Sequence, residues 1–244
     1  MKVLNWNLAR HAPGTPEGRE LLHRISAEHA DVICVTEAHT GSLAELGGHV
    51  LTDRGVRWDE ETENECKVAL WSPEPWTDRA PTHELSEVGG AIIAATDTPL
   101  GRVQVVGVCM PYNMAWPKDG SHPQRPQPWS QHLLFLDRLK PLLAQLDSDC
   151  ATIVVGDFNQ YNPLNWGSWD AHHALNDTLD GLHIVTTGAI EPISEQTVDH
   201  VAVSPHLRAA SIRGLDRYAE DGSALSDHFG LAVELEAGGV RLIN

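Results

Sequence analysis

The chain has 244 residues, of which 41% are hydrophobic and 21% are charged, and its formal net charge is −17. This apolar content can build a sizeable core and excludes disorder over most of the chain, and a chain of this length commonly forms one domain. We therefore predict a single domain over residues 1–244. The acidic balance argues against long-range capture of nucleic acid, because polyanion binding draws on clustered Lys and Arg side chains.

Short apolar runs of strand length recur along the chain. Several are apolar throughout instead of alternating, which is typical of strands buried on both faces. The predicted strands are residues 3–6, 32–36, 68–71, 91–96, 103–109, 152–155, 198–203 and 231–235.

Apolar residues at helical spacing lie between these strands. They predict helices over residues 16–30, with His29 on the apolar face, and over residues 130–146, and a weaker pattern predicts a third over residues 169–182. The order mixes adjacent strands with strand–helix–strand units. It predicts an α/β fold, a two-sheet layered α/β sandwich with helices flanking the sheets.

Two segments interrupt this pattern. Residues 59–65 hold five acidic side chains in seven positions and are expected to form a solvated loop. Residues 111–130 are rich in Pro and Trp and include the basic residues Lys118, His122 and Arg125. An irregular segment of this length within a compact domain is usually functional or disordered, and its aromatic residues argue against disorder.

The four cysteines are widely spaced and form no CxxC pair, so a structural zinc site is not expected. Cys34 and Cys109 lie inside apolar runs, where a free thiol acts as a small hydrophobe, and this favours a reducing, cytoplasmic location. No signal-peptide pattern and no stretch near the roughly 18 apolar residues of a membrane span is present, so no membrane association is expected. Nothing in the sequence indicates an obligate protein partner.

Polar residues end several of the predicted strands, where a buried strand would favour apolar ones. The segments are Asn5-Trp6-Asn7, Thr36-Glu37, Gly156-Asp157-Phe158-Asn159, Asp199-His200 and Ser226-Asp227-His228. Each segment by itself is more typical of a turn or a helix cap. Asp157 and Asn159 are two positions apart, so an extended backbone directs both side chains to the same side, where they would face one ligand.

Taken in order, these segments resemble the motifs of the endonuclease/exonuclease/phosphatase superfamily across nearly the whole chain. Asn7 matches the Asn that ends the first strand of that family, and Glu37 matches its metal-binding Glu. Residues 156–159 match the GDxN motif and residues 226–228 match the closing SDH motif. Asp199 matches the family Asp that pairs with the final His.

The resemblance implies a divalent-metal-dependent hydrolase of phosphate esters that uses Mg²⁺ or Mn²⁺. Glu37 would bind the metal directly, with Asn7 and Asp227 nearby. This set is chemically consistent, since hard cations choose carboxylate and amide oxygens and keep several waters.

The resemblance also implies a catalytic set of His228, Asp199, Asp157, Asn159 and Asn7. His228, its ring held by Asp199, would donate to the phosphate or transfer a proton. Asp157 and Asn159 would orient or deprotonate the attacking water and stabilise the transition state. The resemblance does not identify which group is the general base.

One position departs from the family pattern. Many members carry a His or Tyr near the end of the strand before the long loop, where this chain has Cys109. We expect Cys109 to belong to the core, because nothing in the sequence supplies it with a base. Tyr112 or Asn113, just beyond the strand, would replace the missing contact to phosphate.

Further substrate contacts are expected from loops. In residues 111–130, Trp116 and Trp129 are available to stack on a base or sugar, and the alternative is that this segment forms a packed lid. Arg10 and His11 follow Asn7 on a loop that should rim the site, and one of them is expected to contact substrate.

The remaining histidines are expected to be structural. His39, His172 and His173 show no metal-ligand spacing and are expected at the solvated surface. His200 follows Asp199 on a strand and should point to the opposite face, away from the site.

Three functions remain open for this set of residues. The first is a phosphodiesterase or nuclease acting on DNA or RNA, favoured by the aromatic loop. The second is a phosphatase or phosphodiesterase of a small phosphorylated metabolite or lipid head group, favoured by the lack of basic clusters. The third is a catalytically inactive binding domain, which the presence of every motif residue argues against.

Overall fold

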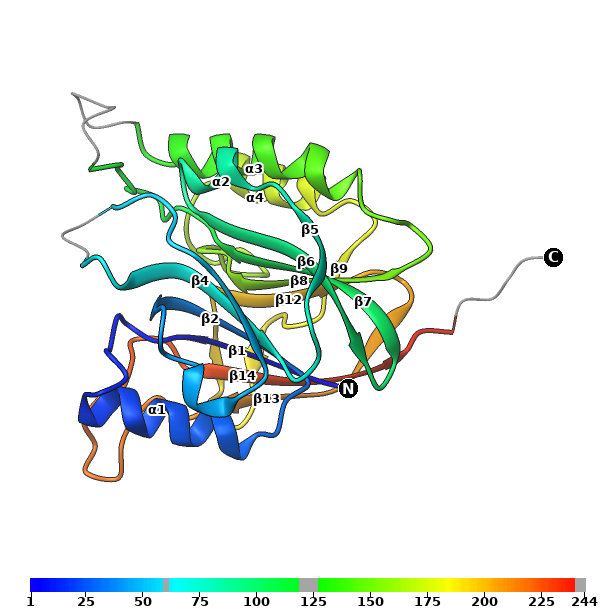
Figure 1. Ribbon diagram of the computed structural model, residues 1–244. Coiled ribbons are helices and arrows are strands. Elements are labelled where there is room, and N and C mark those ends of the chain that lie inside the picture. The colour runs from blue at the N-terminus through cyan, green and yellow to red at the C-terminus, as the bar shows by residue number, and fades with distance from the viewer. Residues whose placement is uncertain (59–61, 119–126, 240–244) are drawn as a thin grey trace.

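Two six-stranded sheets pack face to face, and helices cover both outer faces (Figure 1). The computed structural model describes residues 1–58, 62–118 and 127–239. Helix α1 (Pro16–Ala27) covers the first sheet, at the bottom of the view, and α2 (His83–Ser86), α3 (Ser130–Leu143) and α4 (Trp169–Thr178) cover the second. The predicted two-sheet α/β sandwich with flanking helices is therefore confirmed.

The first sheet joins both ends of the chain. Its strands, in spatial order, are β13 (Leu207–Leu215), β14 (Gly230–Ala237), β1 (Lys2–Asn7), β2 (Val32–His39), β4 (Glu65–Ser72) and β3 (His49–Asp53). Strands β1 and β2 are parallel, and the other neighbours are antiparallel. The last strand of the chain therefore pairs directly with the first. A short 3₁₀ helix, η1 (Ala44–Leu46), precedes β3.

The second sheet is built from the middle of the chain. Its strands, in spatial order, are β5 (Thr77–Ala80), β6 (Gly90–Thr98), β7 (Gly101–Cys109), β8 (Ala151–Asp157), β12 (Asp199–Val203) and β9 (His183–Ile184). Strands β7 and β8 are parallel and are connected through α3. A separate two-stranded ribbon consists of β10 (Ala189–Ile190) and β11 (Glu195–Gln196).

The predicted helices are present but shorter than their sequence patterns. Helix α1 begins after Thr15, whose Oγ1 accepts a hydrogen bond from the Gly18 amide at 3.0 Å. It ends at Ala27, and His29 is exposed with φ +49°, so the prediction that His29 lies on the apolar helical face is wrong. No helix in these described ranges is long and apolar enough to cross a membrane.

Three apolar layers hold the sandwich together. The layer between the sheets includes Cys34, Val105 and Val155, which are completely buried. A second layer packs Leu21 and Ile25 of α1 against the first sheet, and a third layer packs the second sheet against α3 and α4. Full burial of both faces of the central strands explains their continuous apolar sequences.

The buried ring of His132 links the loop after β7 to the segment after β8. Since a carbonyl can only accept, His132 Nδ1 donates to the Pro111 oxygen at 2.7 Å, and Nε2 then accepts from the Gln160 amide at 2.6 Å. The Gln160 carbonyl oxygen lies 2.9 Å from Nε2 of His200, whose Nδ1 lies 3.0 Å from the Thr186 hydroxyl. The hydrogen bonds of these neutral rings therefore join the loop after β7, the segment after β8 and strand β12.

Burial of His132 predicts a loss of stability in acid. Burial lowers the pKa of His132 from 6.5 to about 4, although the hydrogen bond to Pro111 raises it. Below the unfolded pKa the unfolded chain binds a proton that the folded chain does not, so stability falls as pH drops through this window. Relative to a His132→Gln variant, the wild-type protein should lose about 2 kcal/mol of unfolding free energy between pH 7 and pH 5. Urea unfolding at both pH values measures this difference, and a difference that stays constant with pH would contradict it.

Gly156, which precedes Asp157 at the end of β8, has no room for a side chain. Its φ is +144°, and a Cβ at this position would lie 1.9 Å from the Val108 carbonyl oxygen of the neighbouring strand. Both the backbone conformation and the close approach of β7 therefore require glycine. The same close approach places Asp157 at the end of the strand.

We predict that Gly156→Ala lowers the free energy of unfolding by about 2 kcal/mol or more, because strain and a backbone clash act together. Gly222→Ala is the matched control, since Gly222 also has a positive φ, +83°, but a Cβ there meets nothing within 4 Å. The control should lose about 1 kcal/mol, the conformational cost alone. Equal losses in urea unfolding of the two variants would show that the contact with Val108 is unimportant.

Candidate active site

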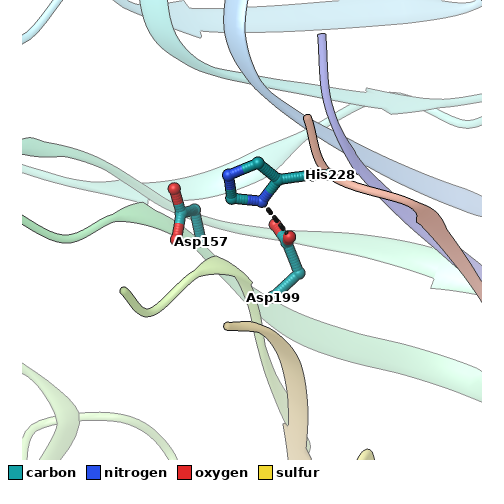
Figure 2. Close-up of side chains that lie close together, drawn as sticks. All are labelled: Asp157, Asp199 and His228. Carbon is teal, nitrogen blue, oxygen red and sulfur yellow. Dashed lines mark hydrogen bonds and ion pairs between the residues drawn. The ribbon is translucent and has the colours of Figure 1, made fainter. Parts of the chain in front are cut away.

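The hydrogen bond between His228 and Asp199 crosses from one sheet to the other. His228 lies just before β14 of the first sheet, and Asp199 begins β12 of the second. The His228 Nδ1 atom lies 2.5 Å from Asp199 Oδ2 (Figure 2), and Asp199 is completely buried. The other carboxylate oxygen of Asp199 accepts from Asn5 Nδ2 at 3.4 Å. The carboxylate therefore fixes the ring so that Nε2 faces away from Asp199.

Asp157 lies beside this pair, as Figure 2 shows. Strands β8 and β12 bring Asp157 and Asp199 into register as direct cross-strand partners. Asp157 Oδ1 accepts from the Asn159 amide at 2.9 Å, and Asn7 Nδ2 lies 3.4 Å from Asp157 Oδ2. Asn159 takes φ +52°, and its side chain donates to the Met110 carbonyl at 2.8 Å. All five predicted catalytic residues, Asn7 included, thus meet at one end of the sandwich.

The electrostatics of this cluster follow from burying two neighbouring acids. Burial raises the pKa of Asp157, and the adjacent Asp199 carboxylate raises it further. Burial lowers the pKa of His228, but attraction and hydrogen bonding to Asp199 outweigh it, so the pKa is raised overall. The cluster therefore combines a carboxyl that protonates unusually easily with an imidazole that keeps its proton.

The segment carrying His228 is fixed to β1 on both sides. The Ser226 hydroxyl donates to the Asn7 carbonyl at 2.7 Å, and the Trp6 indole donates to the His228 carbonyl at 3.0 Å. Gly230 permits this close packing, since a Cβ there would lie 2.6 Å from the Trp6 ring. The closing SDH segment is thus held by backbone contacts with the first strand.

The predicted metal ligands lie on the same edge of the first sheet. Glu37 has φ +44° within β2 and a half-buried side chain, 3.4 Å from the Arg10 guanidinium. Asp227 has an 81% exposed side chain, and its Oδ2 lies 4.0 Å from His228 Nε2. With the Asn7 amide, this set offers oxygen donors, which suit Mg²⁺ or Mn²⁺. Assignment of these three residues as the metal ligands stays a prediction.

A different group of residues would be chosen as metal ligands if only the distances between their ligand atoms were considered. In the parts of the chain that the structure describes, ligand atoms of Asp157, Asp199 and His228 lie within 4.8 Å of one another. However, His228 Nδ1 and both oxygens of Asp199 already make hydrogen bonds within the protein. A cation binding there would compete with the hydrogen bonds that hold Asp199 and His228. We therefore favour proton transfer for this set and the Glu37 side of the site for the metal.

A cavity of about 570 Å³ adjoins the cluster. Its lining residues are Tyr112, Asn113, Asn159, Tyr161, Asn165, Trp166 and Val198. Asn159 belongs to both the cluster and the cavity wall, and Val198 directly precedes Asp199. Two other cavities, of about 400 and 520 Å³, lie at the opposite ends of β8 and β12, where Thr152 and Ser204 are found, and have no catalytic group in common with the cluster.

The predicted substrate contacts are distributed around the site. Tyr112 and Asn113 line the cavity. Trp116 is half-buried, with the Lys118 ammonium 4.5 Å from its ring centroid, and does not line the cavity. His11 lines a small, separate space next to α1. These assignments stay predictions.

Two of the basic residues predicted in the long loop, His122 and Arg125, lie outside the described residues. So do residues 59–61 of the acidic segment, whose positions 62–64 are exposed as expected. Trp129, at the end of the long loop, packs against Trp166 with ring centroids 6.2 Å apart.

Cys109 is completely buried among apolar residues, as expected for a core residue. Burial raises the pKa of its thiol well above the usual value, and Asp157 raises it further. A thiol that resists ionisation is a poor nucleophile.

The other histidines lie apart from the cluster. His200 points away from the site, as predicted, and packs against Phe158 with ring centroids 5.4 Å apart. His173 is exposed as expected, whereas His172 and His39 are half-buried, so for these two the prediction of a solvated position is wrong. His39 is held in place because its Nε2 lies 3.0 Å from the Arg10 carbonyl oxygen.

Sequence reasoning missed three residues of the site. Asn5 was grouped with a polar strand end but given no role, although it contacts both Gly156 and Asp199. Tyr161 and Trp166 line the cavity but lie in an irregular segment after the GDxN motif. The aromatic residues of that segment are the feature of the sequence that could have indicated a role in the site.

The Endonuclease/Exonuclease/phosphatase family matches residues 4–228 of the chain. No curated protein sequence gives a significant match.

Solved structures share the fold at low sequence identity. An AP endonuclease from Archaeoglobus fulgidus is 16% identical, with TM-score 0.67, covering 96% of this chain and 98% of that one. TDP2 from D. rerio, complexed with a single-strand DNA product, is 11% identical, with TM-score 0.66 and coverages of 97% and 98%. An endonuclease/exonuclease/phosphatase from Bacteroides vulgatus is 13% identical, with TM-score 0.68 and the same coverages. With the family match over residues 4–228, the chain belongs to the endonuclease/exonuclease/phosphatase family, whose members are typically metal-dependent phosphoester hydrolases.

Proposed function

We propose that this protein is a phosphodiesterase that hydrolyses nucleic acid with the help of Mg²⁺ or Mn²⁺. The observation that carries the hydrolytic part of the proposal is the cluster of Asp157, Asp199 and His228 at one end of the sandwich. Perturbed pKa values of Asp157 and His228, caused by burial and by Asp199, are typical of groups that transfer protons.

The roles of the residues follow from their protonation tendencies. His228, whose pKa is raised by Asp199, keeps a proton that Nε2 can donate to a phosphate oxygen. Asp157 has a raised pKa and is held by Asn159 and Asn7, so it can accept a proton from the attacking water. Asn159 and Asn7 position this carboxylate. We therefore propose Asp157 as the general base.

Glu37, Asn7 and Asp227 are proposed to hold the divalent cation. When bound, the cation would neutralise negative charge on the phosphate and on the leaving oxygen. The chain needs such a cation because the four acids Glu37, Asp157, Asp199 and Asp227 gather around the site, and a phosphate anion would otherwise be repelled.

The preference for nucleic acid rests on the cavity beside the cluster and on its aromatic lining, Tyr112, Tyr161 and Trp166. An AP endonuclease and a TDP2 bound to single-strand DNA share this fold, which supports the same substrate class. A small phosphorylated metabolite or lipid head group is the second candidate, favoured by the net charge of −17. Three of the four free cysteines are buried, which supports a cytoplasmic location.

Removal of the proposed proton donor or metal ligand should abolish turnover. We expect His228→Ala and Asp157→Asn to lower kcat about 10²- to 10⁴-fold, the range for loss of a general acid or base. Glu37→Ala should lower kcat by a comparable factor, and added Mg²⁺ should not restore it. Treatment of the wild-type protein with EDTA should also lower kcat, and added Mg²⁺ should restore it. The assay follows hydrolysis of single- and double-stranded DNA, RNA, bis-p-nitrophenyl phosphate and inositol phosphates with Mg²⁺ or Mn²⁺.

His173→Ala is the matched control, because His173 is exposed and lies on α4, outside the cluster. It should retain wild-type rates. Absence of turnover of every substrate, or full activity in both His228→Ala and Glu37→Ala, would refute the enzymatic proposal. Turnover of inositol phosphates alone would identify the second candidate instead.

Many family members carry a His or Tyr where this chain has Cys109. We propose that Tyr112 and Asn113 make the contact to phosphate in place of that His or Tyr. Loss of a hydrogen bond to a charged group amounts to about 1.5–3 kcal/mol, so the double variant Tyr112→Phe with Asn113→Ala should lower kcat/KM roughly 10- to 100-fold. Phe keeps the ring that packs edge-on against Trp58 at 5.6 Å between centroids, which limits structural damage. An unchanged kcat/KM of the double variant would remove this role.

A further inference from the structure

The cavity beside the catalytic cluster differs in chemistry from the cluster itself. The cluster is built from acids and a histidine, whereas none of the described residues that line the cavity is Asp, Glu, Lys, Arg or His. The lining instead combines two tyrosines and a tryptophan with the three amides of Asn113, Asn159 and Asn165. The two surfaces are continuous through Asn159, so a substrate whose phosphate lies at the cluster extends a neighbouring group into the cavity.

The indole ring of Trp166 forms one wall of this cavity and packs against the ring of Trp129. Trp166 is 60% exposed, although large aromatic side chains are usually buried, and its ring lies 6.2 Å from that of Trp129 at an angle of 50°. Gly167 allows this contact, because its φ is +118° and a Cβ there would lie 3.0 Å from Trp129 Cζ2. The Trp129 amide also donates to the Asn113 carbonyl at 2.7 Å. The wall is therefore supported from behind and leaves much of Trp166 accessible.

The amides of the cavity are also fixed by the fold. Asn159 donates to the Met110 carbonyl at 2.8 Å, and Asn165 Nδ2 donates to the side chain of Gln196 beside β11. An amide that uses its NH₂ group in this way keeps its oxygen as an acceptor for a ligand donor. Planar aromatic surfaces with amide groups at their edges suit a neutral heteroaromatic ring that stacks and forms hydrogen bonds.

We propose that this cavity is a subsite for one nucleobase, the base next to the phosphodiester bond that is cleaved, with Trp166 as its stacking surface. The inference rests on the proposed function and adds the part of the substrate that is recognised. A volume of about 570 Å³ accommodates a base with its sugar. The described lining residues offer no charged partner to a second phosphate group, and this disfavours polyphosphorylated substrates.

The base must be unpaired to enter this subsite. Stacking on Trp166 and hydrogen bonds to Asn113 or Asn165 use the faces and edges that pairing and stacking occupy in a duplex. The protein should therefore prefer single-stranded strands or strand ends. Local stacking also compensates for the weak electrostatic attraction between a strongly acidic protein and a polyanion.

The test uses a six-unit strand in which five nucleosides are replaced by the abasic tetrahydrofuran analogue and one central thymidine remains. With wild-type protein and Mg²⁺ or Mn²⁺, cleavage should concentrate at the phosphodiester on one side of that thymidine. Stacking of about 1–3 kcal/mol per base corresponds to a roughly 5- to 150-fold preference over the other bonds. Trp166→Ala should reduce this preference to nearly one.

Trp169→Ala is the matched control, since Trp169 is equally exposed at 63% but does not line the cavity. It should keep the wild-type preference. Cleavage spread evenly along the strand, no cleavage of it, or an unchanged preference in Trp166→Ala would overturn the subsite. An all-thymidine strand of the same length separates the two proposals, because its cleavage maintains the proposed nuclease function when the subsite fails. Persistence of that strand uncut, together with absence of turnover of RNA and of double-stranded DNA, would refute the nuclease function.

Discussion

The contact between His228 and Asp199 is the interaction on which the candidate site depends, because it joins two sheets across an interface that is largely apolar. Isolated burial of the Asp199 carboxylate would be strongly unfavourable. Its partners on the first sheet, His228 at 2.5 Å and Asn5 at 3.4 Å, offset that cost. These buried polar groups are thus tolerated because each sheet supplies hydrogen-bond partners to the other, and the same hydrogen bonds fix the orientation of the His228 ring.

Much of the remaining architecture supports this one arrangement. Gly156 lets β7 approach so closely that Asp157 ends its strand opposite Asp199. The buried ring of His132 ties the loop after β7 to the residue that follows Asn159. Such supporting contacts hold side chains within a small range of positions, which proton transfer and in-line attack require. Stability and function therefore draw on the same buried polar groups.

The fold and the centre of the site could be predicted from sequence because they depend on local patterns. Continuous apolar runs indicated the central strands, and polar strand ends such as Asp157 and Asp199 indicated the edge at which the candidate site lies. The edge strand β13 was missed because it contains no continuous apolar run, and its residues 208–213 are exposed or half-buried without regular alternation. The role of Trp166 could not be predicted, since it depends on how an irregular segment folds back onto Trp129. Long-range contacts between irregular segments leave no periodic pattern in a sequence.

Strand order carries a consequence for how this protein is assembled. The first sheet is completed only by β13 and β14, the last strands of the chain, and β14 pairs with β1. His228 lies two residues before β14, so Asp227 and His228 reach the other site residues only when the hairpin of β13 and β14 docks beside β1. The candidate site is therefore complete only when the first sheet has closed, and loss of the pairing between β1 and β14 would separate His228 from Asp199.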